Sequence, residues 1–162
     1  LSLHDALPIS LGVKIDSDEF ISDVELKEPM LLLAYPGHDL INKKEIFPTD
    51  IKDESLILTE TGCSYRAAFE RILKDNGIKP NITLETGSVQ AIKQFTMSGL
   101  GITFLPEIAV KDEVKAGKLI PLNWAGPDLN IISQVIYHKD KWISPALKEF
   151  ISLSHRFLKQ NL

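Results

Sequence analysis

Apolar residues along the chain alternate between short continuous runs and stripes at helical spacing. The run from Met30 to Tyr35 ends at Pro36-Gly37, which predicts a buried strand followed by a turn. From Ser64 the spacing becomes helical, and Asn76-Gly77 supplies a stop signal. The predicted strands are residues 30–35, 56–59, 82–85, 102–105, 119–122 and 131–138. The predicted helices begin at Ser64, Ser88, Pro106 and Ser144.

The helical stripes predict which side chains face a core. In the first helix these are Tyr65, Ala68, Phe69, Ile72 and Leu73. In the last helix they are Leu147, Phe150, Ile151, Phe157 and Leu158. The second helix is expected to be capped by Ser88 and ended by Gly99.

Strands and helices that alternate with short connections indicate crossover units. Such units predict an α/β sandwich with a largely parallel sheet covered on both faces. In sheets of this kind, ligands bind outside the carboxyl ends of the strands, where helix N-termini point. The strand-to-helix connections are therefore the places to look for function.

Three strand-to-helix connections lie at that edge, and we name them the first corner (residues 59–66, TETGCSYR), the second corner (85–88, ETGS) and the third corner (105–107, LPE). Hydroxyls beside a helix start can hold a carboxylate, sulfate or phosphate group, or they can simply cap the helix. Capping is the more common role for one such corner. Because two corners of the same kind lie on one edge, ligand binding is about as well supported as capping. The third corner offers little beyond backbone groups and is expected to be structural.

Catalytic chemistry finds little support in the sequence. No metal-ligand spacing, phosphate-binding loop or nucleophile elbow is present, and four histidines are scattered along the chain. Glu60 and Glu85 could form an acid/base pair, but solvated or capping roles are more common for glutamates. A helix start and Arg66 would favour the thiolate of Cys63, yet the chain has no second cysteine to resolve an oxidised one. We therefore expect no enzyme activity and no cofactor or metal.

Composition and charge limit the classes of partner that the chain is expected to bind. The chain has 162 residues and a net charge of −4, so it lacks the basic field expected of a nucleic-acid binder. No apolar run reaches the roughly 18 residues that a membrane helix needs. The single Cys63 excludes an internal disulfide and fits a reducing compartment. These features favour a soluble domain that binds neither DNA nor membrane by itself.

An ordered set of segments resembles the effector-binding domain of LysR-type transcriptional regulators. The segments are residues 33–40 (LAYPGHDL), 62–66 (GCSYR), 85–92 (ETGSVQAI), 98–106 (SGLGITFLP), 137–140 (YHKD) and 144–150 (SPALKEF). One departure is Asp39, which replaces the proline usual in the family's first segment. The resemblance covers about residues 11–158. It implies a periplasmic-binding-protein-like fold of type 2, a two-lobe α/β sandwich with lobe two complete and lobe one partial.

The same resemblance implies a division into lobes and a set of ligand contacts. Residues 11–30 correspond to the tail of lobe one, 31–134 to lobe two, and 135–162 to the strand and helix that return to lobe one. Ser64 and Ser88 fall at positions that face an effector in the inter-lobe cleft, and Lys14 falls at a strand end that often bears a basic contact. An effector facing Lys14 is expected to be anionic. The remaining expected contacts are Glu60, Thr61, Gly62, Cys63 and Pro106.

The resemblance also implies what the intact protein contains. We expect an N-terminal helix-turn-helix that binds promoter DNA, a homodimer or homotetramer, and a cytoplasmic location. An extracytoplasmic solute-binding protein of a transporter shares the two-lobe architecture and is the alternative; an enzyme on the same fold is a third. The opening decapeptide LSLHDALPIS has no family counterpart. One reverse translation of it is similar to a sequencing-library adapter, so we expect residues 1–10 to be an artefact rather than a genuine N-terminal segment.

Overall fold

The protein divides into two compact units. A computed structural model describes residues 9–13, 17–129 and 131–159. Residues 1–28 and 130–162 form one unit, here the terminal unit, and residues 29–129 form the central unit. The predicted division into lobes, after residues 30 and 134, stays a prediction. Strand β8 (Ile131–His138), however, belongs wholly to the terminal unit.

The terminal unit is an antiparallel sheet with one helix. Its strands are β1 (Ile9–Val13), β2 (Phe20–Lys27) and β8, in the order β1-β8-β2. Strand β1 includes two residues of the opening decapeptide. Strand β2 was not predicted, because polar residues interrupt its alternation and a bulge shifts its register between Ser22 and Val24. Helix α4 (Pro145–Lys159) lies against β2, where His155 Nε2 is 2.8 Å from Asp23 Oδ1.

Helix α4 buries less of its surface than the sequence predicts. Leu147 and Ile151 are half-buried, as expected. Phe150 and Phe157 were expected to face inward, but they are 36% and 72% exposed. That part of the prediction is wrong, because the side of α4 that carries His155 is the one held against β2. The side chain of Leu158 lies outside the described residues.

The central unit contains two sheets, which an isolated bridge joins into one mixed layer, here the central sheet. Its strands are β3 (Met30–Ala34), β4 (Ser55–Leu58), β5 (Asn81–Glu85), β6 (Thr103–Pro106) and β7 (Ile120–Pro121), and the two sheets have the orders β6-β3-β7 and β4-β5. Strands β4 and β5 pair in parallel, and a parallel bridge from Leu56 to Ile102 joins β4 to the start of β6. Strand β3, however, pairs antiparallel with both β6 and β7. The prediction of a largely parallel sheet therefore holds for β4, β5 and β6 and fails at β3.

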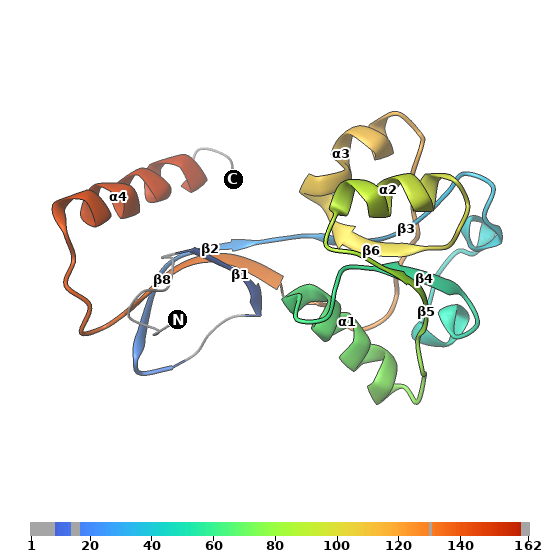
Figure 1. Cartoon of the computed structure of the whole chain (residues 1–162), viewed down its shortest axis with the longest axis horizontal. Helices are drawn as coiled ribbons and strands as arrows, with labels where there is room; N and C mark the ends of the chain where they lie inside the picture. Colours follow the sequence, from blue (N-terminus) through green and yellow to red (C-terminus); the bar gives the residue numbers. More distant parts are fainter. Residues whose placement is uncertain (1–8, 14–16, 130, 160–162) are drawn as a thin grey trace. The chain divides into compact units, whose positions relative to one another are not determined.

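Helices cover both faces of the central sheet. Helix α1 (Ser64–Asp75) lies on one side, and α2 (Val89–Met97) and α3 (Glu107–Lys115) lie on the other (Figure 1). Phe69 of α1 is fully buried and stacks on Phe104 of β6, with ring centroids 4.6 Å apart. Two short 3-10 helices, Asp39–Asn42 and Pro48–Ile51, were not predicted because each is only about one turn long.

Candidate functional site at the carboxyl edge of the central sheet

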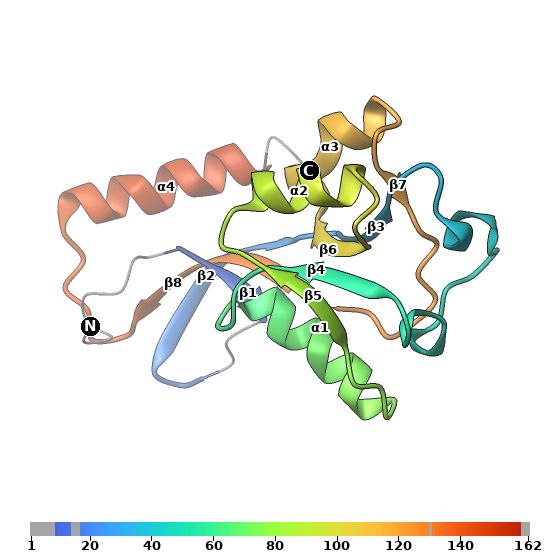
Figure 2. The same cartoon turned by 45° about the vertical axis from the view of Figure 1, so that its right-hand side comes forward.

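The parallel pairing of β4 and β5 brings the first and second corners together. Leu58 and Glu85, the last residues of the two strands, are register partners. Helices α1 and α2 therefore begin at the same edge while lying on opposite faces of the sheet (Figure 2). The Glu85 carboxylate crosses between the corners, and its Oε1 accepts hydrogen bonds from Thr61 N at 2.9 Å and from Thr61 Oγ1 at 3.2 Å.

A buried arginine completes the link between the corners. Arg66 is 6% exposed, and its guanidinium contacts two carboxylates. Its Nε donates to Glu70 Oε1 at 2.9 Å within α1, and its Nη1 lies 2.7 Å from Glu85 Oε2. The same Nη1 also donates to the carbonyl oxygen of Thr59. One guanidinium thus ties the end of β4, the end of β5 and the first turn of α1.

Both charged partners are stabilised in their ionised forms. The hydrogen bond from the Thr61 backbone, followed by that from Arg66, lowers the pKa of Glu85 below its ordinary value. Burial by itself would lower the pKa of Arg66, but the hydrogen bonds to Glu85 and Glu70 outweigh it and raise that pKa. Glu85 is therefore an ionised part of this network rather than half of an acid/base pair with Glu60.

The N-cap side chain of the first corner does not cap α1. Cys63 is the N-cap and makes no side-chain capping bond, and Ser64 is the first helical residue. The chain reaches this helix through Gly62 at φ +102°, a left-handed conformation that other residues rarely adopt. Thr61 uses its donors on Glu85 instead. Neither Cys63 nor Thr61 therefore caps α1 with its side chain.

The second corner behaves differently, because Ser88 does cap its helix. Ser88 Oγ accepts from Ala91 N at 3.3 Å, and Thr86 Oγ1 accepts from Ser88 N at 3.3 Å. Both predicted ends of α2 are confirmed, since Gly99 follows the helix at φ +82°. Gly87 lies under the Glu60 carboxyl group, whose atoms would be 3.2 Å from a Cβ at that position. A side chain at residue 87 would therefore displace Glu60.

Two residues of the first corner, Thr59 and Tyr65, form a buried polar pair that was not predicted from the sequence. Burial, followed by the neighbouring Cys63 thiol, raises the pKa of Tyr65 to about 12, and the Thr59 hydroxyl offsets this only in part. Thr59 is 6% exposed, and its Oγ1 makes no hydrogen bond of regular geometry within the described residues. Neither residue stands out in a sequence, because tyrosine and threonine also occupy ordinary half-buried positions.

The chain matches the family model described as the LysR substrate binding domain over residues 7–159. The chain belongs to this family. Its fold is accordingly the periplasmic-binding-protein-like, type 2 fold of LysR effector-binding domains, and the ordered segments correctly indicated it.

Curated relatives of this LysR domain are transcriptional regulators. The uncharacterized HTH-type transcriptional regulator YwqM of Bacillus subtilis is 51% identical over 159 residues, which is 97% of this chain and 54% of that protein. The RuBisCO operon transcriptional regulator of Acidithiobacillus ferrooxidans is 31% identical over 87% of this chain and 46% of its own length. The chain thus spans about half the length of these relatives. The transporter alternative finds no support among them.

Solved LysR effector-binding domains share the fold. The CcmR regulatory domain of Synechocystis, in complex with 2-PG, aligns with a TM-score of 0.79 at 22% identity, over 94% of this chain and 74% of that one. The QuiR effector-binding domain, in complex with shikimate, aligns with a TM-score of 0.77 at 18% identity, over 94% and 72% of the two chains. At these identities the likeness concerns the fold alone.

The remaining predicted contacts of this LysR domain differ in their exposure to solvent. Glu60, Thr61 and Gly62 are exposed, and Cys63 and Ser64 are half-buried, so the first corner is accessible to a ligand. Pro106 is buried, pairs with Met30, and is the N-cap of α3. Lys14 lies outside the described residues.

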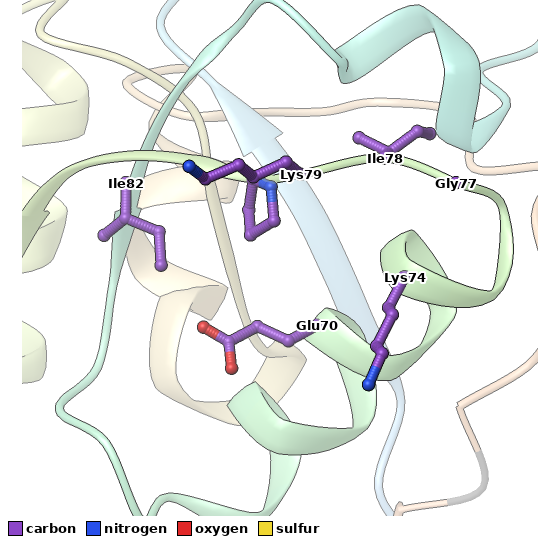
Figure 3. Close-up of a pocket in the computed structure, with 7 residues that line it drawn as sticks. Glu70, Lys74, Gly77, Ile78, Lys79 and Ile82 are labelled. Atoms are coloured by element: carbon purple, nitrogen blue, oxygen red, sulfur yellow. The ribbon is translucent and has the colours of Figure 1, made fainter.

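A hollow lies away from this edge, beside the second half of α1. It has a volume of about 650 Å³ and is formed by the second half of α1, the following turn and β5. Its walls are Ile78, Pro80 and Ile82, and the Glu70 carboxylate is directed towards Ile82 (Figure 3). Glu70 is already bound to Arg66, and the amino groups of Lys74 and Lys79, which also line the hollow, point in different directions (Figure 3), so its polar groups do not converge as in a small-molecule site.

Among residues 9–13, 17–129 and 131–159, every helix is too short or too polar to cross a bilayer. The same ranges contain no group of three or more His, Cys, Asp or Glu side chains placed to bind a metal ion.

Proposed function

We propose that this LysR effector-binding domain senses a small anionic metabolite at its first and second corners. The observation that carries the proposal is that α1 and α2 begin at the same edge, with Ser64 on one helix start and Ser88 on the other. The first N–H groups of a helix have no acceptor within the helix, and its dipole favours negative charge there. Two such helix starts with hydroxyls beside them suit a carboxylate or a phosphate.

The charges around the corners are compatible with an anion. Glu85 and Glu70 share the one positive charge of Arg66, at 2.7 Å and 2.9 Å, so attraction of an anion to this edge would come from the helix N–H groups. Glu60 is exposed, and its carboxyl group packs over Gly87 rather than over the start of α1. Two solved relatives hold small molecules, 2-PG and shikimate. We propose the same class of ligand here, with Glu60, Thr61, Gly62 and Cys63 forming the wall around Ser64.

In the intact regulator, effector binding would alter transcription without catalysis. A ligand that binds one arrangement of the protein more tightly shifts the population towards that arrangement. The DNA-binding part would lie in an N-terminal helix-turn-helix, and the regulator would act in the cytoplasm as a homodimer or homotetramer. A ligand-dependent change in the geometry of that oligomer would change its affinity for promoter DNA.

Thermal-shift screening of the full-length protein with small carboxylates and phosphates tests the site. A compound that raises Tm in the wild type is expected to lose its effect in Ser64→Ala. Ser98→Ala is the matched control, because it removes a hydroxyl that bonds Gln94 O at the far end of α2. An equal shift in wild type and Ser64→Ala would refute the site, and an upstream secretion signal in place of a helix-turn-helix would refute the regulator.

A further inference from the structure

The Glu85 carboxylate occupies the point where donors of the first corner converge. It receives the Thr61 backbone N–H, the Thr61 hydroxyl and the Arg66 guanidinium, with the latter at 2.7 Å from Oε2. Arg66 in turn holds the carbonyl of Thr59. The Glu85 side chain, at the end of β5, therefore holds the loop before α1 through Thr61 and the first turn of α1 through Arg66.

Local bonds within the corner also hold this loop, such as the one from Ala67 N to Cys63 O at 3.0 Å. Gly62 interrupts it with a left-handed φ of +102°, and the Cys63 N–H reaches the Glu60 carbonyl at a long 3.3 Å. Cys63 contributes no side-chain cap to α1. The first N–H groups of α1 can face a ligand in a defined direction only if the loop before them is fixed, and Glu85 provides the charged hydrogen bonds that fix it.

We propose that Glu85 is a positioning residue for effector binding: an internal anion that orders the first corner and holds it in register with the second. This inference rests on the proposed function for the effector, but the ordering of the corner stands on the geometry alone. Because Thr61 already donates to Glu85, an anionic effector binds at the Ser64 side of the corner and not at Thr61.

Glu70 provides a matched control. It is a second carboxylate on the same guanidinium, at 2.9 Å, and its side chain is 34% exposed against 40% for Glu85. Glu70→Gln removes one charge from Arg66 but leaves the two corners tied. Glu85→Gln removes the same charge and also breaks the tie, because one acceptor oxygen becomes an NH2 group, a donor that would face the donors of either Thr61 or Arg66.

Amide hydrogen exchange on the whole chain tests the ordering without a ligand. The reporters are the N–H groups of Cys63, bonded to Glu60 O, and Thr86, bonded to Leu58 O, because neither contacts the Glu85 side chain. Their exchange is expected to rise about tenfold in Glu85→Gln and to change less than about twofold in Glu70→Gln, with the amide of Leu73 in the helix core unchanged. Equal exchange in the two variants would overturn the proposal. Should Glu85→Gln fail to fold, Glu85→Asp keeps the charge but is too short for both partners, and the same rise is expected.

Titration with inorganic sulfate at constant ionic strength tests the effect on the site. Losing a nearby negative charge should by itself tighten anion binding in both variants. If Glu85 positions the first corner, Glu85→Gln should instead bind sulfate with a Kd about tenfold higher than that of the wild type. Glu70→Gln should bind sulfate as tightly as the wild type or more tightly. Tighter binding in both variants would show that Glu85 acts through charge alone and would overturn the positioning role. If sulfate does not bind the wild type, the anion site fails, and the exchange experiment still decides the ordering role of Glu85.

Discussion

Gly101 lies where β4 meets the start of β6, and replacing it with alanine should open the central sheet. A Cβ at this position would be 2.2 Å from the carbonyl oxygen of Ser55 and 2.9 Å from its carbonyl carbon. Both atoms belong to the backbone, so no side chain can rotate away. The two hydrogen bonds that join β4 to this segment, Ile102 N to Ser55 O and Ile57 N to Ile102 O, are each 2.9 Å and would be stretched or lost.

The expected loss of stability follows from these contacts. Overpacking a buried site typically costs ~1–3 kcal/mol, and two buried backbone hydrogen bonds contribute ~1 kcal/mol each. Gly101→Ala should therefore lower the free energy of unfolding by about 3–5 kcal/mol. Gly77→Ala is the control: Gly77 has φ +72°, but an added Cβ meets nothing within 4 Å. Its cost is limited to the left-handed backbone, about 1–2 kcal/mol.

Urea denaturation followed by tryptophan fluorescence measures both variants. Trp124 reports on the central unit, since its ring lies 6.0 Å from that of Phe69. Trp142 is 78% exposed in the terminal unit and would be replaced by phenylalanine in all samples. The urea midpoint should fall further for Gly101→Ala than for Gly77→Ala, with an unchanged slope. A smaller fall for Gly101→Ala would refute the close approach of β4 and β6.

Three further predictions concern packing, pH and capping. Phe69→Ala should lower the free energy of unfolding by about 3–5 kcal/mol in the same assay, because it empties the buried contact with Phe104; a loss below about 1 kcal/mol would contradict the stacking. The lowered pKa of Glu85 means that its ionised form stabilises the fold above its ordinary value of 4.5, and that this stabilisation is lost as pH falls through the lowered pKa. The difference in urea midpoint between wild type and Glu85→Gln should therefore shrink below pH 4.5, and a difference independent of pH would contradict the Thr61 and Arg66 bonds. Ser88→Ala should cost about 1 kcal/mol through loss of the α2 cap, while Ser88→Asp restores stability but, being negative, weakens binding of an anion; full binding by Ser88→Asp would argue against an effector contact at this position.

The local elements could be predicted from the sequence because their signals lie close together along the chain. The run of apolar residues in β3, the helical stripe of α1 and the glycines at residues 77 and 99 each act within a few positions. The two hydroxyl-bearing corners were found in the same way, and their placement on one edge followed from the alternation of strands and helices. The ordered family segments extended these local signals to the fold of the whole chain.

Tertiary structure decided what depends on partners distant in the chain. The antiparallel pairing of β3 arises from contacts with β6 and β7 some seventy to ninety residues away, which no local pattern encodes. The exposure of Phe157 depends on which side of α4 meets β2, and an amphipathic stripe cannot specify its neighbour. The roles of Thr61, Arg66 and Glu85 likewise appeared only once β5 lay beside β4, because a carboxylate 24 residues away competes with any local cap for the same donors. The sequence thus determined where the candidate site lies, and the folded chain determined which of its groups are already bound to one another.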